Sequence, residues 1–100
     1  MKKNDVLQIL RENMNELKRF GVKKIGIFGS FARNEAKEES DIDIVVEFEK
    51  GRGGVKDFAG LVEFLENLLR REVDILTPMG IETIRIKSVR ERIKKEVFYV

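Results

Sequence analysis

Residues 27–46 of the chain read IFGSFARNEAKEESDIDIVV, and this stretch contains the clearest structural pattern of the sequence. It begins within an apolar segment, 24–28, that has the composition of a short buried strand. Gly29-Ser30 then marks a turn, and 31–36 is predicted to form one or two helical turns. Over 41–48, apolar residues alternate with mainly acidic ones, as in a strand with one buried face. We therefore predict an α/β domain, because a strand, a turn, a short helix and a second strand follow one another closely.

Hydrophobic periodicity predicts the elements on either side of this stretch. Apolar residues at steps of three and four indicate helices, and short apolar runs bounded by turn residues indicate strands. We expect helices over 5–20 and 58–69, a strand over 72–76, and a charged helical segment in the remainder. The element order predicts a two-layer or three-layer domain with a small sheet, and it leaves the strand directions open.

The C-terminal segment carries two further patterns. Ser88 and Glu91 have the spacing of a capping box, which predicts the start of a helix there. The residues of this helix that we expect to face the core are Ile86, Val89, Ile93 and Val97. The last residues, 97–100, are apolar, and they either close the core, add a strand or dock on a partner.

Composition excludes several kinds of chemistry. The chain has no cysteine and no histidine, which excludes disulfides, thiolate or imidazole metal ligands, and Ser-His-Asp or Cys-His catalysis. Its 20 Lys and Arg residues nearly balance 18 Asp and Glu residues, so the net charge of +2 argues against direct binding of nucleic acid. No signal peptide or membrane-spanning run is recognisable, and we expect a soluble, cytoplasmic protein with a single domain over residues 1–100.

Three carboxylates fall at unusual positions in the predicted strands. Asp41 and Asp43 lie two residues apart, so they project from the same face with Cα atoms about 6–7 Å apart. Asp74 interrupts an otherwise apolar strand, and it would join them if the two strands pair. Three anions in such proximity repel one another, a conflict that two bridging magnesium ions would resolve. The alternative is that each aspartate is an ordinary turn or edge residue, and the spacing alone does not decide between the two.

The Gly29-Ser30 turn also has two interpretations. Glycine lets a ligand approach the backbone closely, and backbone N–H groups and a serine hydroxyl can donate to phosphate oxygens. Alternatively, Ser30 caps the short helix that follows, and Gly29 relaxes the turn. The turn is not a P-loop, because no Gly-Lys-Ser/Thr follows it.

Taken together, these residues resemble a known family. Gly29-Ser30, ten intervening residues and then Asp41-Ile42-Asp43 match the Gly-Ser-x10-Asp-x-Asp signature of minimal nucleotidyltransferases, members of the DNA polymerase β-like nucleotidyltransferase superfamily. Residues 73–76, with Asp74, look like the strand that carries the third carboxylate of that family. The resemblance covers nearly the whole chain. One departure is Asn34, where glycine commonly follows the arginine.

The resemblance implies a fold, a set of ligands and a role for each matching residue. The fold would be the polymerase β-like nucleotidyltransferase fold, an α/β (α+β) domain with a small mixed sheet flanked by helices. Asp41 and Asp43 would hold two Mg²⁺ ions. Asp74 would bind the catalytic ion and help the acceptor hydroxyl lose its proton. Gly29 and Ser30 would bind the terminal phosphates of ATP, and Arg33 would either add positive charge near them or remain a solvated side chain.

The resemblance also suggests a partner. Minimal nucleotidyltransferases of this kind look like antitoxins of small helical HEPN-domain toxins, in which AMP from ATP is transferred to a tyrosine of the toxin. The predicted elements use almost the whole chain, so we expect another protein to bring the acceptor or to be the acceptor. Two alternatives remain: an antitoxin that neutralises its partner by binding alone, and a structural module whose acids are surface charges. A homodimer is also possible.

Overall fold

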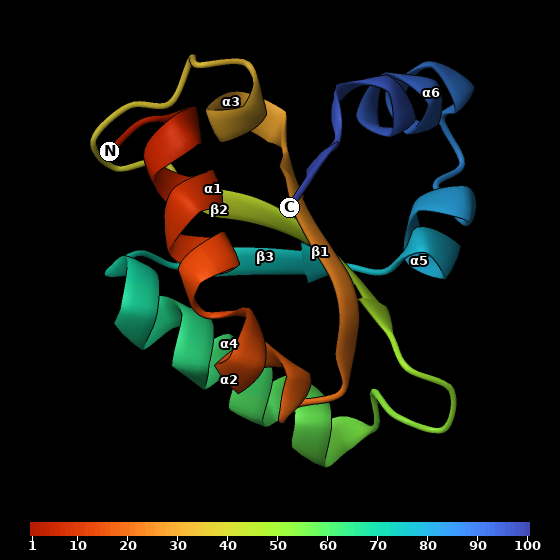
Figure 1. Ribbon diagram of the computed structural model, residues 1–100. Coiled ribbons are helices and arrows are strands. Elements are labelled where there is room, and N and C mark those ends of the chain that lie inside the picture. Colours follow the sequence, from red (N-terminus) through yellow and green to blue (C-terminus); the bar gives the residue numbers. More distant parts are fainter.

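The computed structural model describes all 100 residues and contains one mixed four-stranded sheet (Figure 1). The strands are β1 (Val22–Phe28), β2 (Ile42–Phe48), β3 (Val73–Leu76) and β4 (Phe98–Tyr99), in the order β3-β2-β1-β4. β1 is antiparallel to both β2 and β4, whereas β2 and β3 are parallel. The N-terminal ends of β2 and β3 therefore lie beside the C-terminal end of β1.

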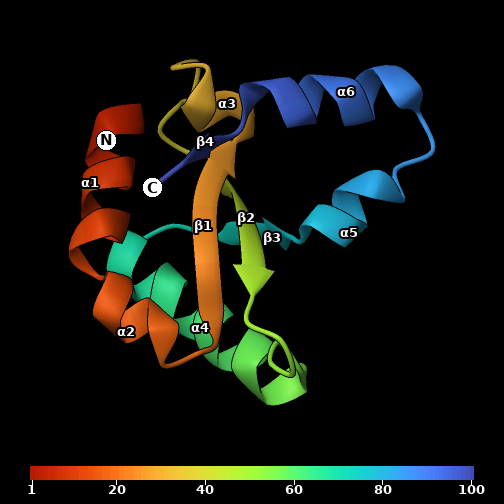
Figure 2. The same cartoon turned by 45° about the vertical axis from the view of Figure 1, so that its right-hand side comes forward.

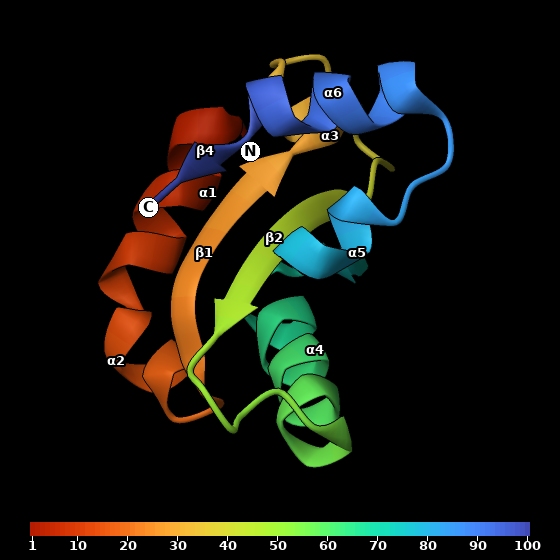
Figure 3. The same cartoon turned by 90° about the vertical axis from the view of Figure 1, so that its right-hand side faces the viewer.

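Helices cover both faces of this sheet (Figures 2 and 3). They are α1 (Lys3–Glu12), α2 (Met14–Lys18), α3 (Gly29–Ala32), α4 (Val55–Leu69), α5 (Pro78–Glu82) and α6 (Lys87–Glu96). α1, α2 and α4 pack on one face, and α5 and α6 lie over the other. The expected α/β class and small mixed sheet are confirmed. None of the helices combines the length and the apolar character that crossing a membrane requires.

The alternation in β2 explains how one strand serves two layers. Ile42, Ile44 and Val46 are fully buried in the larger core, under α1, α2 and α4. Val45, on the opposite face, belongs to a smaller apolar cluster with residues of α5 and α6. Because successive side chains of a strand alternate between faces, Asp43 lies on the same face as Val45. The larger core therefore fixes the strand, and the smaller cluster leaves room for polar residues at its end.

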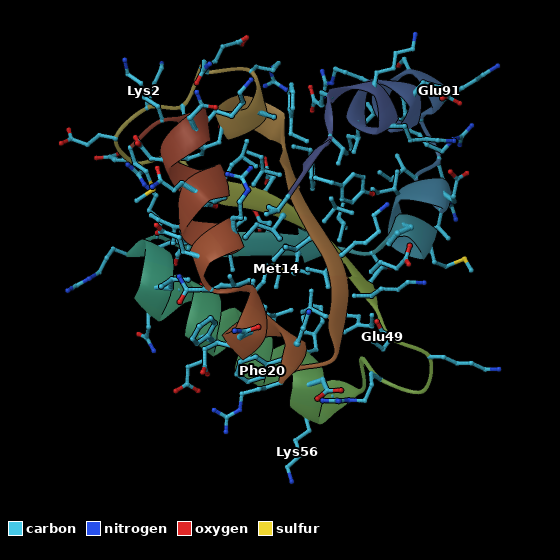
Figure 4. The ribbon with its side chains drawn as sticks, in the orientation of Figure 1. Lys2, Met14, Phe20, Glu49, Lys56 and Glu91 are labelled. Atoms are coloured by element: carbon cyan, nitrogen blue, oxygen red, sulfur yellow. The ribbon has the colours of Figure 1, made fainter.

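The single helix predicted over 5–20 is interrupted at Asn13, which separates α1 from α2. The Asn13 side-chain amide donates a hydrogen bond to the Ile9 carbonyl oxygen at 2.8 Å. Such a bond competes with the regular backbone pattern and favours the end of a helix. The segment still packs inward at both ends, and the Phe20 ring centroid lies 5.5 Å from that of Phe64 on α4 (Figure 4).

The C-terminal segment differs from expectation in two ways, and it decides between the alternatives left open for the last residues. α6 begins after an N-cap at Ile86, so Ser88 and Glu91 lie inside the helix and do not form a capping box. Ile86 is 62% exposed and does not face the core, although Ile93 is buried there. The last residues form β4, which pairs with β1, so they add a strand. These pairings join residues far apart in sequence, which local periodicity does not reveal.

Candidate active site

The acidic residues gather at the end of the sheet where β2 and β3 begin. Asp43 is the second residue of β2, and Asp41 lies just before the strand. β3 runs parallel to β2 with Asp74 directly opposite Asp43, so both side chains project from the same face. Asp43 is half-buried, whereas Asp41 and Asp74 are exposed. The structure thus brings Asp43 and Asp74 to one edge of one face, with Asp41 near enough for its charge to act on Asp43.

Gly29 lies against this acidic group. Its backbone has φ +72°, a left-handed conformation that L side chains rarely adopt, and a Cβ atom at this position would overlap the Asp43 carboxylate. Asp43 pairs with Phe28, the last residue of β1, so the chain turns at Gly29 directly beside the acid. Glycine is therefore required both by the backbone conformation and by the space that Asp43 fills.

The surroundings of Asp43 make its negative charge unfavourable. Burial, and to a lesser extent the charges of Asp74 and Asp41, together raise the pKa of Asp43 from 3.8 to about 6. The guanidinium of Arg33 acts the other way, while Glu96 adds to the repulsion. A positively charged ligand at this position would relieve that repulsion.

Glu96, which the sequence analysis did not single out, is a fourth acid at this site. It ends α6, and its side chain is only 12% exposed. Glu96 Oε1 accepts a hydrogen bond from the Gly29 backbone N–H at 3.0 Å, and Oε2 accepts one from the Arg33 guanidinium at 2.9 Å. The bond to Glu96 raises the pKa of Arg33. Gly29 and Glu96 are 67 positions apart, so no local motif contains this contact.

Ser30 does not cap its helix. α3 begins at Gly29 with Phe28 as the N-cap, and no side chain makes a capping bond. The Ser30 hydroxyl lies within the first turn and makes no hydrogen bond to another group of the chain. The alternative that Ser30 is a helix cap is therefore wrong, and its hydroxyl is available to a ligand.

The three aspartates are the residues that would hold the magnesium ions that the resemblance implies. All three supply oxygen ligands, the type that magnesium prefers, and Asp43 and Asp74 lie on one face of the sheet with Asp41 next to them in the chain. However, no three acidic side chains converge closely enough to form a ready-made metal site. The repulsion that raises the pKa of Asp43 opposes such convergence. The donor set and its placement fit divalent cations, and the role of these residues as ligands stays a prediction.

Two hollows in the surface lie near these elements. One, of about 410 Å³, runs along α6 and is lined by Ser88, Glu91, Arg92, Lys95 and Glu96. The other, of about 340 Å³, lies between the N-terminus and the segment after β1, lined by residues that include Met1, Phe31 and Ala36. Only the hollow along α6 includes a residue that contacts Gly29. None of the three aspartates lines either hollow.

Comparison with known proteins shows what the chain is similar to. Residues 7–100 match the family described as nucleotidyltransferase domain. The chain is 40% identical over 97 residues to the protein adenylyltransferase MntA of Thermococcus cleftensis, which covers 96% of this chain and 93% of that protein. A solved structure described as a "putative minimal nucleotidyltransferase" is 33% identical, with a TM-score of 0.74 over 98% of this chain and 95% of that one. A solved toxin-antitoxin structure with AMP-PNP shares the fold, with a TM-score of 0.61 over 99% of this chain and 72% of that one at 19% identity.

Proposed function

The chain belongs to the nucleotidyltransferase domain family, and on that premise we propose that it transfers AMP from ATP to a hydroxyl group of a partner protein. The observation that carries the proposal is the register of β2 and β3, which sets Asp43 opposite Asp74, with Gly29 against the Asp43 carboxylate. The 40% identity to a protein adenylyltransferase supports AMP as the transferred group and a protein as the acceptor.

In the proposed reaction, the acceptor oxygen forms a bond to the α-phosphorus of ATP, and the bond from that phosphorus to the β-phosphate oxygen breaks. Asp74 takes up the hydroxyl proton, and its exposed position on an edge strand leaves it accessible to a partner. Asp41 and Asp43 would hold two Mg²⁺ ions, one of them shared with Asp74, which would neutralise charge on the attacking and leaving oxygens. Pyrophosphate is the leaving group.

Gly29, Ser30 and Arg33 would bind the terminal phosphates. The Gly29 backbone N–H, which donates to Glu96 in the free chain, would donate to a phosphate oxygen instead, and the Ser30 hydroxyl has no other partner within the chain. Arg33 lies one helical turn further along, and its guanidinium donates to the same Glu96 carboxylate as the Gly29 N–H, so the two donors point to one position. These donors would orient the triphosphate so that its α-phosphorus lies near the carboxylates.

The proposed partner is a HEPN-domain toxin, with one of its tyrosines as the acceptor, and the proposed role of the chain is that of its antitoxin. Two observations support this choice. The relative MntA is a protein adenylyltransferase, and a chain of the same fold occurs in a toxin-antitoxin complex with AMP-PNP. A homodimer of this chain is compatible with the proposal if its interface leaves the acidic edge open.

The experiment is a transfer assay with the intact chain. The protein is incubated with magnesium, ATP labelled at the α-phosphate and the product of the neighbouring gene, and we expect label on that product. Asp43→Asn should abolish labelling, because it removes a carboxylate from the centre of the acidic group. The matched control is Glu47→Gln, on the same strand and face, whose side chain pairs instead with Lys23. Label transfer by Asp43→Asn at the level of the control would contradict the catalytic role.

The assay also separates the proposed enzyme from an antitoxin that acts by binding alone. If the unaltered protein neutralises its neighbour without transferring label, the binding alternative holds. If Asp43→Asn still binds the neighbour but no longer neutralises it, transfer is the mechanism. Co-purification of the two proteins, measured alongside neutralisation, distinguishes these outcomes.

A further inference from the structure

Glu96, at the end of α6, lies on the turn after β1. This carboxylate bridges the Gly29 N–H at 3.0 Å and the Arg33 guanidinium at 2.9 Å. The Glu96 side chain is only 12% exposed, whereas the Arg33 side chain that it contacts is 37% exposed. This contact is also the only link of its kind between α6 and the turn after β1, because no other side chain of α6 hydrogen-bonds to α3.

The position is an unfavourable one for a carboxylate. The C-terminal end of a helix carries partial negative charge, which disfavours an anion there. Asp41, Asp43 and Asp74 add further negative charge at the same edge of the sheet. The hydrogen bonds from its two donors therefore hold Glu96 in place, although the surrounding negative charge repels it.

Those two donors are of the kind that bind phosphate. A guanidinium and a backbone N–H can each donate a hydrogen bond to a different oxygen of the same group. That group can be a carboxylate or a phosphate. Under the proposed function, Gly29 and Arg33 receive terminal phosphate oxygens of ATP. Each donor hydrogen serves one strong acceptor at a time, so Glu96 and a phosphate cannot both occupy this position.

We propose that Glu96 is an internal competitor that occupies the terminal-phosphate position of the free protein and is displaced when the nucleotide binds. The inference rests on the proposed function, because it takes Gly29 and Arg33 as phosphate ligands. It assigns Glu96 a role in selectivity. Only an anion that carries more charge than one carboxylate, such as a magnesium-bound triphosphate, displaces Glu96. After the transfer, the return of the Glu96 carboxylate to Gly29 and Arg33 helps to expel pyrophosphate.

The experiment measures the dissociation constants of Mg²⁺-ATP and of Mg²⁺-tripolyphosphate by titration calorimetry. Glu96→Gln and Glu96→Ala should both bind about fivefold more tightly than the unaltered protein, which corresponds to about 1 kcal/mol for the lost competing ion pair. The matched control is Glu91→Gln, which makes the same charge change on the same helix (Figure 4) without a contact to Gly29 or Arg33. Its affinity should equal that of the unaltered protein.

A second measurement uses the unaltered protein and needs no variant. The carboxyl-carbon NMR signal of Glu96 should shift when Mg²⁺-tripolyphosphate is added, because the carboxylate loses both donors. If neither Glu96 variant binds more tightly and the Glu96 signal stays in place while the unaltered protein binds ATP, the inference is wrong and the proposed function stands. If the unaltered protein binds neither ATP nor tripolyphosphate, the proposed function and the inference both fail.

Discussion

Asp43 lies in surroundings that disfavour its negative charge. Its side chain is half-buried beside two other acids, and burial and repulsion together raise its pKa to about 6. An apolar or amide side chain would fit this position with less electrostatic conflict. The conflict is useful only if a cation binds there, as the proposed function requires. Replacing Asp43 should therefore change the stability of the fold and the activity in opposite directions.

We predict that Asp43→Asn raises the melting temperature at pH 7.5 in the absence of divalent ions while abolishing AMP transfer. The gain is at most about 3 kcal/mol, the equivalent of the pKa shift, and it is smaller to the extent that solvent screens the charge. Thermal unfolding followed by circular dichroism measures it, with Glu47→Gln as the control. A lower melting temperature for Asp43→Asn would contradict the electrostatic account.

The same prediction has a pH-dependent form. The pKa of Asp43 is raised from 3.8 to about 6 in the folded chain, so between these values the folded chain binds more protons than the unfolded chain. The free energy of unfolding should therefore fall as pH rises through this window. Denaturant unfolding at pH 4.5 and 7 measures the change, and the difference between the unaltered protein and Asp43→Asn isolates this group. A difference that does not vary with pH would rule out Asp43 as its source.

Gly29 provides the second prediction at this scale. Gly29→Ala places a side chain in a left-handed conformation and against the Asp43 carboxylate, so it should destabilise the fold by about 1–3 kcal/mol. The control is Gly51→Ala, at φ +81° with no atom near the added methyl group, which tests the backbone term alone. Chemical denaturation of both variants separates the two effects. Equal losses would show that overlap with Asp43 contributes nothing.

At the scale of the elements, predictability depends on the sequence distance over which a structure is determined. The apolar stripe of α4 and the alternation of β2 are local, and both elements form where the periodicity indicates. The break at Asn13 depends on one side-chain bond, and β4 depends on pairing with a strand some 70 positions earlier in the chain. Neither leaves a periodic trace in the sequence.

The candidate site divides in the same way. Asp41 and Asp43 follow from strand periodicity, and Asp74 from one acid in an apolar run, although its register with Asp43 required the structure. Glu96 could not be predicted, because it is one of several charged residues on α6 and its contact with Gly29 spans 67 positions. Family motifs and periodicity identify residues on strands and turns, and they do not identify long-range contacts between side chains.

The loop before α4 gives a prediction for an element. Asp57 accepts hydrogen bonds from Arg52 at 2.8 Å and from the Gly53 N–H at 3.0 Å, and these lower the pKa of Asp57 to about 2. The stability they provide is present above about pH 4 and is lost as pH falls towards 2. Asp57→Asn should lower the melting temperature at pH 7 and remove this acid-induced loss. The control is Glu16→Gln, which breaks only an exposed pair with Arg19, and a melting temperature equal to that control would contradict the prediction.

At the scale of the whole molecule, the two faces of the sheet have different tasks. The face under α1, α2 and α4 holds the large core that fixes the strands, whereas the face under α5 and α6 has a smaller apolar cluster and ends in acids. A ligand that binds the acidic edge contacts β2, β3 and the turn after β1 at once. Ligand binding there should therefore stabilise the sheet as a unit.

We predict that magnesium and ATP together raise the melting temperature of the unaltered protein, because they bind the folded chain and not the unfolded one. At a ligand concentration of 100 times the dissociation constant, the gain is about 2.7 kcal/mol. Asp43→Asn and Asp74→Asn should lose most of this gain, whereas Glu47→Gln, at the opposite end of β2, should keep it. Scanning fluorimetry or calorimetry with each variant, with and without both ligands, provides the comparison. An equal rise in Asp43→Asn would place the binding site elsewhere on the molecule, and no rise in any variant would favour a structural module over an enzyme.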